Sequence, residues 1–133
     1  VTGVQKMREA GARAGCAQNM RQLGVAIRTY NTQYEHFPAG TMPNPDLPPE
    51  QRLSFYATLC PFLESRPRYF SKEERWGSPD SVATMEVWGR ATIVHCPEWE
   101  RAHGPRPTGH LAITNYVGVA GLGADAAARP AGA

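Results

Sequence analysis

The first 34 residues constrain the fold of this chain most strongly, because helical periodicity continues through all of them. From residue 16 onward, apolar side chains recur every three or four positions, as one face of a helix requires. This spacing predicts one α-helix over residues 1–34, ended by Pro38, which cannot continue a helix. After Cys16, the face that we expect to pack on the core consists of Met20, Leu23, Ile27, Tyr30 and Tyr34.

A second apolar stripe occupies the first half of the same helix, at Val4, Met7, Gly11 and Ala14. At about 100° per residue, it lies nearly opposite the first stripe, which indicates a second neighbour. A helix of 34 residues is roughly 51 Å long, whereas a globule of this size is about 36 Å across. We therefore expect the upper half to project. The predicted self-assembly face is Val4, Met7, Gly11, Ala14 and Gly15.

The alternative for this segment is a break at Gly11 or Gly15, because each internal glycine costs about 1 kcal/mol relative to alanine.

The rest of the chain contains shorter predicted elements. Helical spacing over residues 52–64, interrupted by Pro61, predicts a short kinked helix, and Ser78-Pro79 predicts the start of another that ends at Gly89. Apolar and β-branched residues predict strands over 91–96 and 111–120, separated by a loop over 97–109. The predicted organisation is a long helix (1–34), an α+β head (35–120, with the lower half of the helix as its core) and a flexible tail (121–133).

Composition excludes several classes of protein. A net charge of +2 over 133 residues is too small to indicate nucleic-acid binding. No apolar run in the sequence is long enough to cross a bilayer. The chain starts Val-Thr-Gly without an initiator methionine, so we expect the encoded precursor to have a further segment before Val1.

Histidine and cysteine residues raise the question of a metal or catalytic site. The candidates are Cys60, His95, Cys96, His103 and His110. Their spacing contains none of the short ligand pairs that zinc sites favour, and neighbours on a strand such as His95 and Cys96 would point to opposite faces. We therefore predict no metal, no cofactor and no catalytic residues, and hence no enzyme.

A basic and aromatic stretch over residues 66–76 is a possible ligand loop. It could bind single-stranded nucleic acid or sugar by stacking and cation–π contacts, although such aromatic residues more often pin a loop to the core. Its candidate residues are Arg66, Arg68, Tyr69, Phe70 and Trp76.

The order of several short motifs resembles a known family. The matching stretches are residues 4–10, 16–26, 30–31, 37–38, 59–64, 76–79, 96–97 and 114–121, the last reading TNYVGVAG. This set resembles the prepilin-like proteins of planctomycete bacteria, a domain family of unknown function often described as type II secretion pseudopilin-like.

The resemblance implies a fold, a location and a function. The fold would be α+β and type IV pilin-like, with the long helix laid on a small antiparallel sheet. A hydrophobic segment before Val1 would anchor the head in the inner membrane, facing the periplasm or the exterior. The function would be that of a non-catalytic structural subunit of a secretion or pilus-like filament, whose partners are other pilin-like subunits or copies of itself. The alternative is a membrane-anchored binding module that recognises polysaccharide, nucleic acid or a secreted protein through residues 66–76.

The resemblance also implies a disulfide between Cys16 and Cys96, since relatives commonly have cysteines at both places and an exported domain meets an oxidising compartment. Cys60 would then be buried outside the bond. Three reduced, buried cysteines are the alternative.

Overall fold

Helix α1 (Gly3–Tyr34) is the longest element of the protein and is unbroken through Gly11 and Gly15. The computed structural model describes residues 2–63, 70–71, 73–88, 92–104 and 114–117. At its start, the Thr2 backbone N–H donates to the Gln5 side chain, at 3.2 Å. At its end, Glu35 adopts a left-handed conformation, with φ at 60°, and donates its N–H to the Asn31 carbonyl. The predicted long helix is confirmed over its described residues, and the alternative of a break is wrong.

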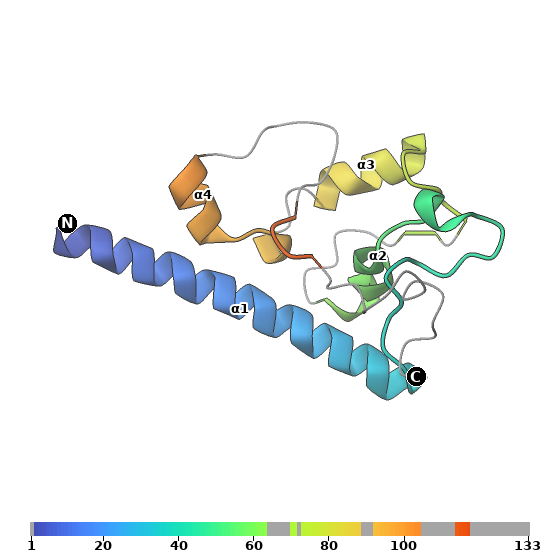
Figure 1. Ribbon diagram of the computed structural model, residues 1–133, viewed down its shortest axis with the longest axis horizontal. Coiled ribbons are helices and arrows are strands. Elements are labelled where there is room, and N and C mark those ends of the chain that lie inside the picture. Colours follow the sequence, from blue (N-terminus) through green and yellow to red (C-terminus); the bar gives the residue numbers. More distant parts are fainter. Residues whose placement is uncertain (1, 64–69, 72, 89–91, 105–113, 118–133) are drawn as a thin grey trace.

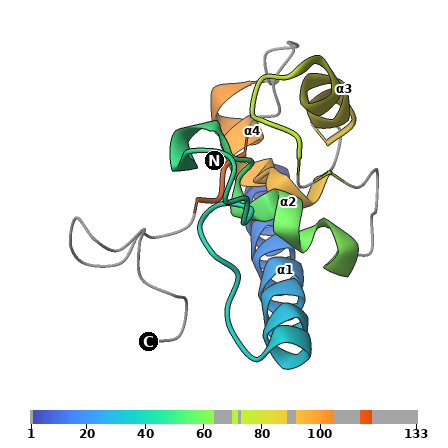
Figure 2. The same cartoon turned by 90° about the vertical axis from the view of Figure 1, so that its right-hand side faces the viewer.

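The other elements lie along one side of α1 (Figures 1 and 2). Helix α4 (Pro97–His103) and the 3₁₀ turn η3 (Thr92–Val94) cover its middle. Helix α2 (Phe55–Leu59) and the turn η2 (Cys60–Phe62) pack nearer its C-terminal end. Helix α3 (Pro79–Trp88) lies on the far side of this layer, and the turn η1 (Pro49–Gln51) is in the connection before α2.

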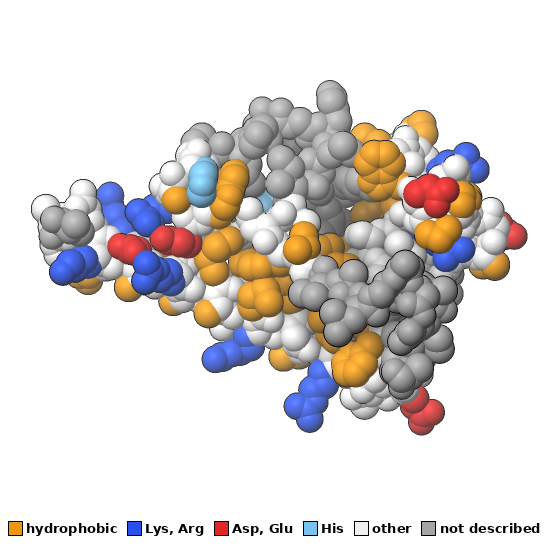
Figure 3. Space-filling model, in the orientation of Figure 1, with side chains coloured by type: hydrophobic (Ala, Val, Ile, Leu, Met, Phe, Trp, Pro, Cys, Tyr) orange, Lys and Arg blue, Asp and Glu red, His pale blue; other side chains and the backbone are white. Residues whose placement is uncertain are grey.

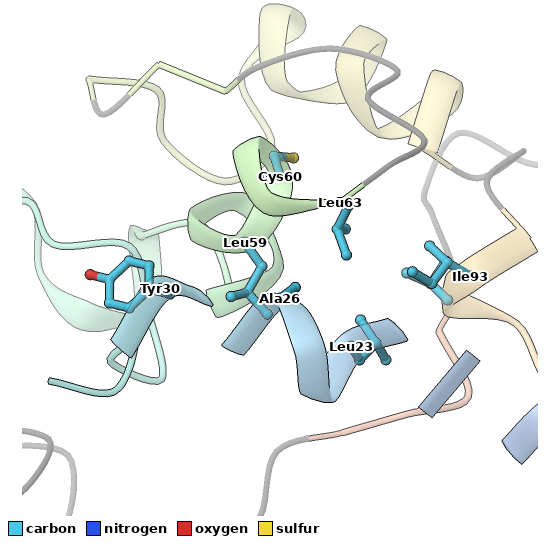
Figure 4. Packing of buried hydrophobic residues seen from close by; sticks show 8 residues of the cluster. Leu23, Ala26, Tyr30, Leu59, Cys60, Leu63 and Ile93 are labelled. Carbon is cyan, nitrogen blue, oxygen red and sulfur yellow. The ribbon is translucent and has the colours of Figure 1, made fainter. Parts of the chain in front are cut away.

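The core lies between α1 and the layer of short elements (Figure 4). Ala26 of α1 is fully buried and faces Leu59 of α2, also fully buried, while Leu23 lies opposite Ile93. The small side chain at position 26 gives α2 room to approach α1. The buried cluster contains Leu23, Ala26, Tyr30, Leu59, Cys60, Leu63, Ile93 and Val94.

The predicted antiparallel sheet is wrong for the described residues, which contain no strand. Their one isolated β-bridge joins Thr41 and Ser54. The α+β fold class is therefore corrected to a helical one for the part of the chain that the structure describes.

The predicted strand at residues 91–96 contains a 3₁₀ turn. Ile93, Val94 and His95 are consecutive and all buried, between 3% and 4% exposed. A strand would point alternate side chains to opposite faces, whereas a tight turn lets all three reach the interior. The β-branched composition reflected burial against α1 rather than sheet pairing.

The second predicted strand is described only over residues 114–117, and these form no strand. They do lie beside the first segment: the Asn115 N–H donates to the Val94 carbonyl at 3.0 Å, and the Cys96 N–H donates to the Asn115 side chain at 2.8 Å. One backbone bond and one side-chain bond thus join the two segments where a sheet would use a ladder. Residues 111–113 and 118–120 of this prediction, and the predicted tail, lie outside the described residues.

Two helix predictions are confirmed and one loop prediction is wrong. The kinked helix at 52–64 corresponds to α2 and η2, with Pro61 inside the turn, and α3 begins at Pro79. Residues 97–103, predicted as loop, form α4. Among the described residues, no helix is both long and apolar enough to be a membrane span.

Candidate functional site

The N-terminal turns of α1 extend beyond α4 and expose apolar side chains (Figures 1 and 3). Val4 is 60% and Met7 is 75% exposed, and Gly11 and Ala14 are exposed as well. Gly15 differs, because a Cβ added there would lie 3.1 Å from Pro97 Cγ of α4. The structure therefore leaves four of the five expected assembly residues on the surface and places the fifth against the chain's own α4.

A disulfide joins α1 to the start of α4. The structure contains the Cys16–Cys96 bond that the resemblance implies, with the two Cα atoms 4.9 Å apart. The bond connects positions 80 residues apart in the sequence. Cys60 is 2% exposed and lies outside the bond, at the start of η2, where it belongs to the core cluster.

Hydrogen bonds on both sides of the disulfide fix the same junction. Asn19 of α1 donates its side-chain N–H to the His95 carbonyl at 2.6 Å. The Tyr116 hydroxyl lies 3.4 Å from the Cys16 carbonyl and 3.4 Å from that of His95. These contacts hold the residues before α4 to the middle of α1, so α4 must lie along the helix.

Charged side chains border the junction on its solvent side. Arg13 pairs with Glu9 at 2.5 Å on α1, and Arg101 pairs with Glu98 at 2.7 Å on α4. Hydrogen bonds from Arg101 lower the pKa of Glu98, and Arg13 across the junction acts in the same direction. Each pair lies within one helix and faces water, so it adds little to the stability of the fold.

The core-facing stripe of α1 is rotated relative to the predicted one. Leu23 and Tyr30 are buried and Ile27 packs at the edge of the core, as expected. Met20 is 52% exposed, so its placement in the core is wrong; it lies about 120° around the helix from Ala26, the centre of the buried face. Sequence reasoning missed Ala26, since a small residue adds little to an apolar stripe.

Aromatic rings gather where α1 ends. The Tyr30 ring is 4.6 Å from Tyr34 and 5.6 Å from Phe62, and His36 lies edge-on to Tyr30 at 5.6 Å. Burial raises the pKa of Tyr30, and the neighbouring Tyr34 adds to that effect. Tyr34, expected on the core face, is 48% exposed and borders this cluster from the solvent side.

Two of the expected ligand-loop residues are described, and they have different environments. Phe70 packs against the hydrophobic core, as a pinned loop requires. Trp76 is 55% exposed and its backbone N–H donates to the Gln51 carbonyl at 2.8 Å. The other expected residues, Arg66, Arg68 and Tyr69, lie outside the described residues.

The histidines and cysteines considered for chemistry occupy separate places. Cys96 is in the disulfide, His95 is buried directly after η3, and His103 stacks on Trp99 with the ring centres 4.8 Å apart. His110 lies outside the described residues. Among the residues that the structure describes, no three His, Cys, Asp or Glu side chains form a group able to hold a metal.

Comparison with known proteins places the chain by sequence. A family model described as "protein of unknown function (DUF1559)" matches residues 5–130, which is nearly the whole chain. No curated protein and no solved structure matches this chain.

Proposed function

We propose that this chain, which belongs to the DUF1559 family of proteins of unknown function, is a pilin-like structural subunit of a bacterial envelope filament. The subunit has no catalytic role in this proposal. It is anchored in the inner membrane by an apolar segment before Val1 and assembles through the N-terminal turns of α1, with its head in the periplasm or outside the cell. The planctomycete type II secretion pseudopilins that its motifs resemble suggest this role.

The observation that carries the proposal is the projection of α1 beyond α4. Val4 and Met7 are exposed on a helix that continues without a break into the core of the head. Exposed apolar side chains on a rigid projection fit an assembly surface, because neighbouring copies would remove them from water.

The Cys16–Cys96 disulfide is consistent with the proposed location, since disulfides persist outside the cytoplasm. The proposed anchor needs about 20 predominantly apolar residues to span the bilayer.

The test uses the full-length gene product in a bacterial host with an inner membrane. A photo-crosslinking residue at Met7 should yield a ladder of crosslinked copies in the membrane fraction. The matched control carries the same residue at Asp80, which is exposed on α3, far from α1, and should yield no ladder. A protein found only in the soluble fraction, or equal crosslinking from both positions, would refute the proposal.

Removing the exposed apolar side chains provides a second measurement. With the photo-crosslinking residue moved to Ala14, which is also exposed, Val4→Ser with Met7→Ser should abolish the ladder without altering the urea midpoint, because neither side chain contributes to the core. A ladder that survives this double change would show that assembly uses another surface.

An envelope binding module is a second candidate, favoured by the presentation of Trp76. Gly77 has a positive φ of 79°, and the Ser81 hydroxyl donates to the Arg75 carbonyl at 3.0 Å, so the turn is held from within the fold. An exposed indole on a fixed turn can stack on sugar rings or bases. This function would involve polysaccharide, nucleic acid or a secreted protein as the partner.

Fluorescence titration separates the two candidates. In the binding-module hypothesis, soluble dextran or a single-stranded oligonucleotide should quench tryptophan fluorescence saturably, and Trp76→Ala should abolish the effect. Trp99→Ala is the matched control, since Trp99 is also exposed but lies on α4. No quenching by either ligand would count against recognition of sugar or nucleic acid.

A further inference from the structure

The C-terminal end of α1 exposes aromatic rings beside a carboxylate. We define the α1 C-terminal patch as Tyr34, Glu35, His36, Phe37 and Phe62. Tyr34 and Phe37 are 48% and 52% exposed, and the rings of Tyr34 and Phe62 lie 6.2 Å apart, edge to face. Exposed aromatic rings at one end of the helix, one of them packed on the partly buried Phe62, are apolar surface of the kind that marks an interaction site.

The electrostatics of this patch favour a cation. The last carbonyls of a helix carry partial negative charge, and the last turn of α1 has no basic side chain to offset it. Glu35 follows directly and its side chain is exposed. The faces of the aromatic rings add negative potential, which attracts Lys and Arg. A partner that fits must therefore combine a basic group with apolar side chains.

The other end of the same helix has that combination. We define the α1 N-terminal patch as Val4, Met7 and Arg8, which lie within about 100° of one another around the helix, together with the long side chain of Lys6, about 100° farther round from Met7; all four are exposed. The first turn has no acidic residue. The nearest acidic side chain, Glu9, pairs with Arg13, and neither Lys6 nor Arg8 belongs to an ion pair within the described part of the chain.

We propose that the α1 N-terminal patch of one copy docks on the α1 C-terminal patch of a second copy, head to tail. The inference rests on the proposed function, since it names the contact through which the subunits assemble. Lys6 and Arg8 meet Glu35 and the aromatic faces, while Val4 and Met7 cover the exposed rings of Tyr34 and Phe37.

Helix geometry makes this contact intermolecular and open-ended. Met7 and Tyr34 are 27 residues apart on an unbroken helix, roughly 40 Å at 1.5 Å per residue, so one copy cannot join its own two patches. The two patches are different surfaces, so each copy keeps one of each after docking. A heterologous contact of this kind builds a filament rather than a closed dimer unless the rotation happens to close.

Zero-length carbodiimide crosslinking tests the contact directly, because it joins a lysine to a carboxylate only where they touch. The chain has two lysines, Lys6 and Lys72, so a Lys6–Glu35 product is readily identified by mass spectrometry. Mixing isotopically light and heavy protein at millimolar concentration should yield mixed-mass Lys6–Glu35 peptides, with dimers and trimers on a denaturing gel.

Two matched variants make the test specific. Tyr34→Ala should lower the yield of the Lys6–Glu35 product by about tenfold, the effect of losing an interaction worth about 1.4 kcal/mol. Gln33→Ala, an exposed neighbour without a ring, should leave the yield unchanged. Far-UV circular dichroism and the urea midpoint establish that both variants fold like the parent.

The outcomes separate this inference from the proposed function. Absence of the Lys6–Glu35 product, or a yield that Tyr34→Ala does not reduce, would overturn the head-to-tail contact. If the Met7 crosslinking ladder in cells nevertheless persisted, the subunits would assemble through another pair of surfaces and the proposed function would stand. Loss of that ladder together with a monomeric protein would refute both.

Discussion

Removal of the Cys16–Cys96 disulfide is the perturbation with the largest expected effect on this fold. The double variant Cys16→Ala with Cys96→Ala deletes the bond and leaves two small apolar side chains that fit the same half-buried space. It also avoids the unpaired thiol that a single substitution would leave, which could pair with Cys60 in the unfolded chain.

The expected magnitude follows from the loop that the bond closes. A cross-link between residues 80 apart restricts the unfolded chain and stabilises the folded one by about 4–5 kcal/mol in the chain-entropy model. A domain of this size has a free energy of unfolding of about 5–15 kcal/mol, so the loss is a large fraction of the total. The double variant should therefore unfold at a much lower urea concentration.

The structure also predicts where the weakening is greatest. No side chain of α4 is buried, so the core retains little of this helix once the bond is gone. The hydrogen bond from Asn19 to the His95 carbonyl and the contact of Pro97 with Gly15 remain, and neither is a substitute for a covalent link. Amide exchange of α4 should therefore rise more than that of α2, which packs on Ala26 through Leu59.

Urea denaturation followed by circular dichroism, with hydrogen exchange in parallel, measures both effects. Cys60→Ala is the control for the loss of a cysteine outside the bond, and it should respond to a dithiol reductant as the parent does, whereas the double variant should not. A double variant that loses less than about 1 kcal/mol would contradict the loop-closure reasoning. Unchanged exchange in α4 would contradict the claim that the bond holds this helix.

Two further predictions concern α1 and α4. Gly24→Ala should raise the free energy of unfolding by about 0.5–1 kcal/mol, because its new Cβ meets nothing within 4 Å and alanine favours the helix. Gly15→Ala should gain less, because its Cβ would lie 3.1 Å from Pro97; equal gains in urea denaturation would contradict this contact. Hydrogen bonds from Arg101 lower the pKa of Glu98, so this carboxylate stabilises the fold above the ordinary carboxyl pKa and loses its contribution as pH falls through its lowered folded value. The urea midpoint of Glu98→Gln should thus be below that of the parent at pH 7 and converge with it in strong acid, and a gap that persists there would contradict the pairing.

The exposed apolar stripe at the start of α1 can be predicted from the sequence, whereas the aromatic patch at its end cannot. The stripe of Val4 and Met7 is visible as a period of three and four, because helix periodicity is written into neighbouring residues. The α1 C-terminal patch is not visible in this way: Phe62 comes from η2 and reaches Tyr34 only after the chain has folded back on α1. From the sequence alone, the helical spacing of Tyr34 from Tyr30 places it on the core face.

Helices were predictable wherever local signals specify them. Residues 3–34 form one helix because hydrogen bonds run between positions four apart and Pro38 stops the pattern, so the outcome depends little on the rest of the chain. Pro79 at the start of α3 and Pro61 within η2 acted locally in the same way. Helix α4 carried comparable signals that the loop prediction overlooked: Pro97 at its first position and Gly104 just past its end.

Only the tertiary structure determined the conformation of residues 92–96 and which face of α1 is buried. β-branched residues at Thr92, Ile93 and Val94 favour a strand, but a strand needs a partner ladder, and here α1 and the Asn115 side chain occupy that place. The periodic pattern of α1 allows several rotations of its core face. The disulfide to α4 and the close approach of α2 select the one centred on Ala26 and leave Met20 in water, because contacts between distant residues determine which side of a helix is covered.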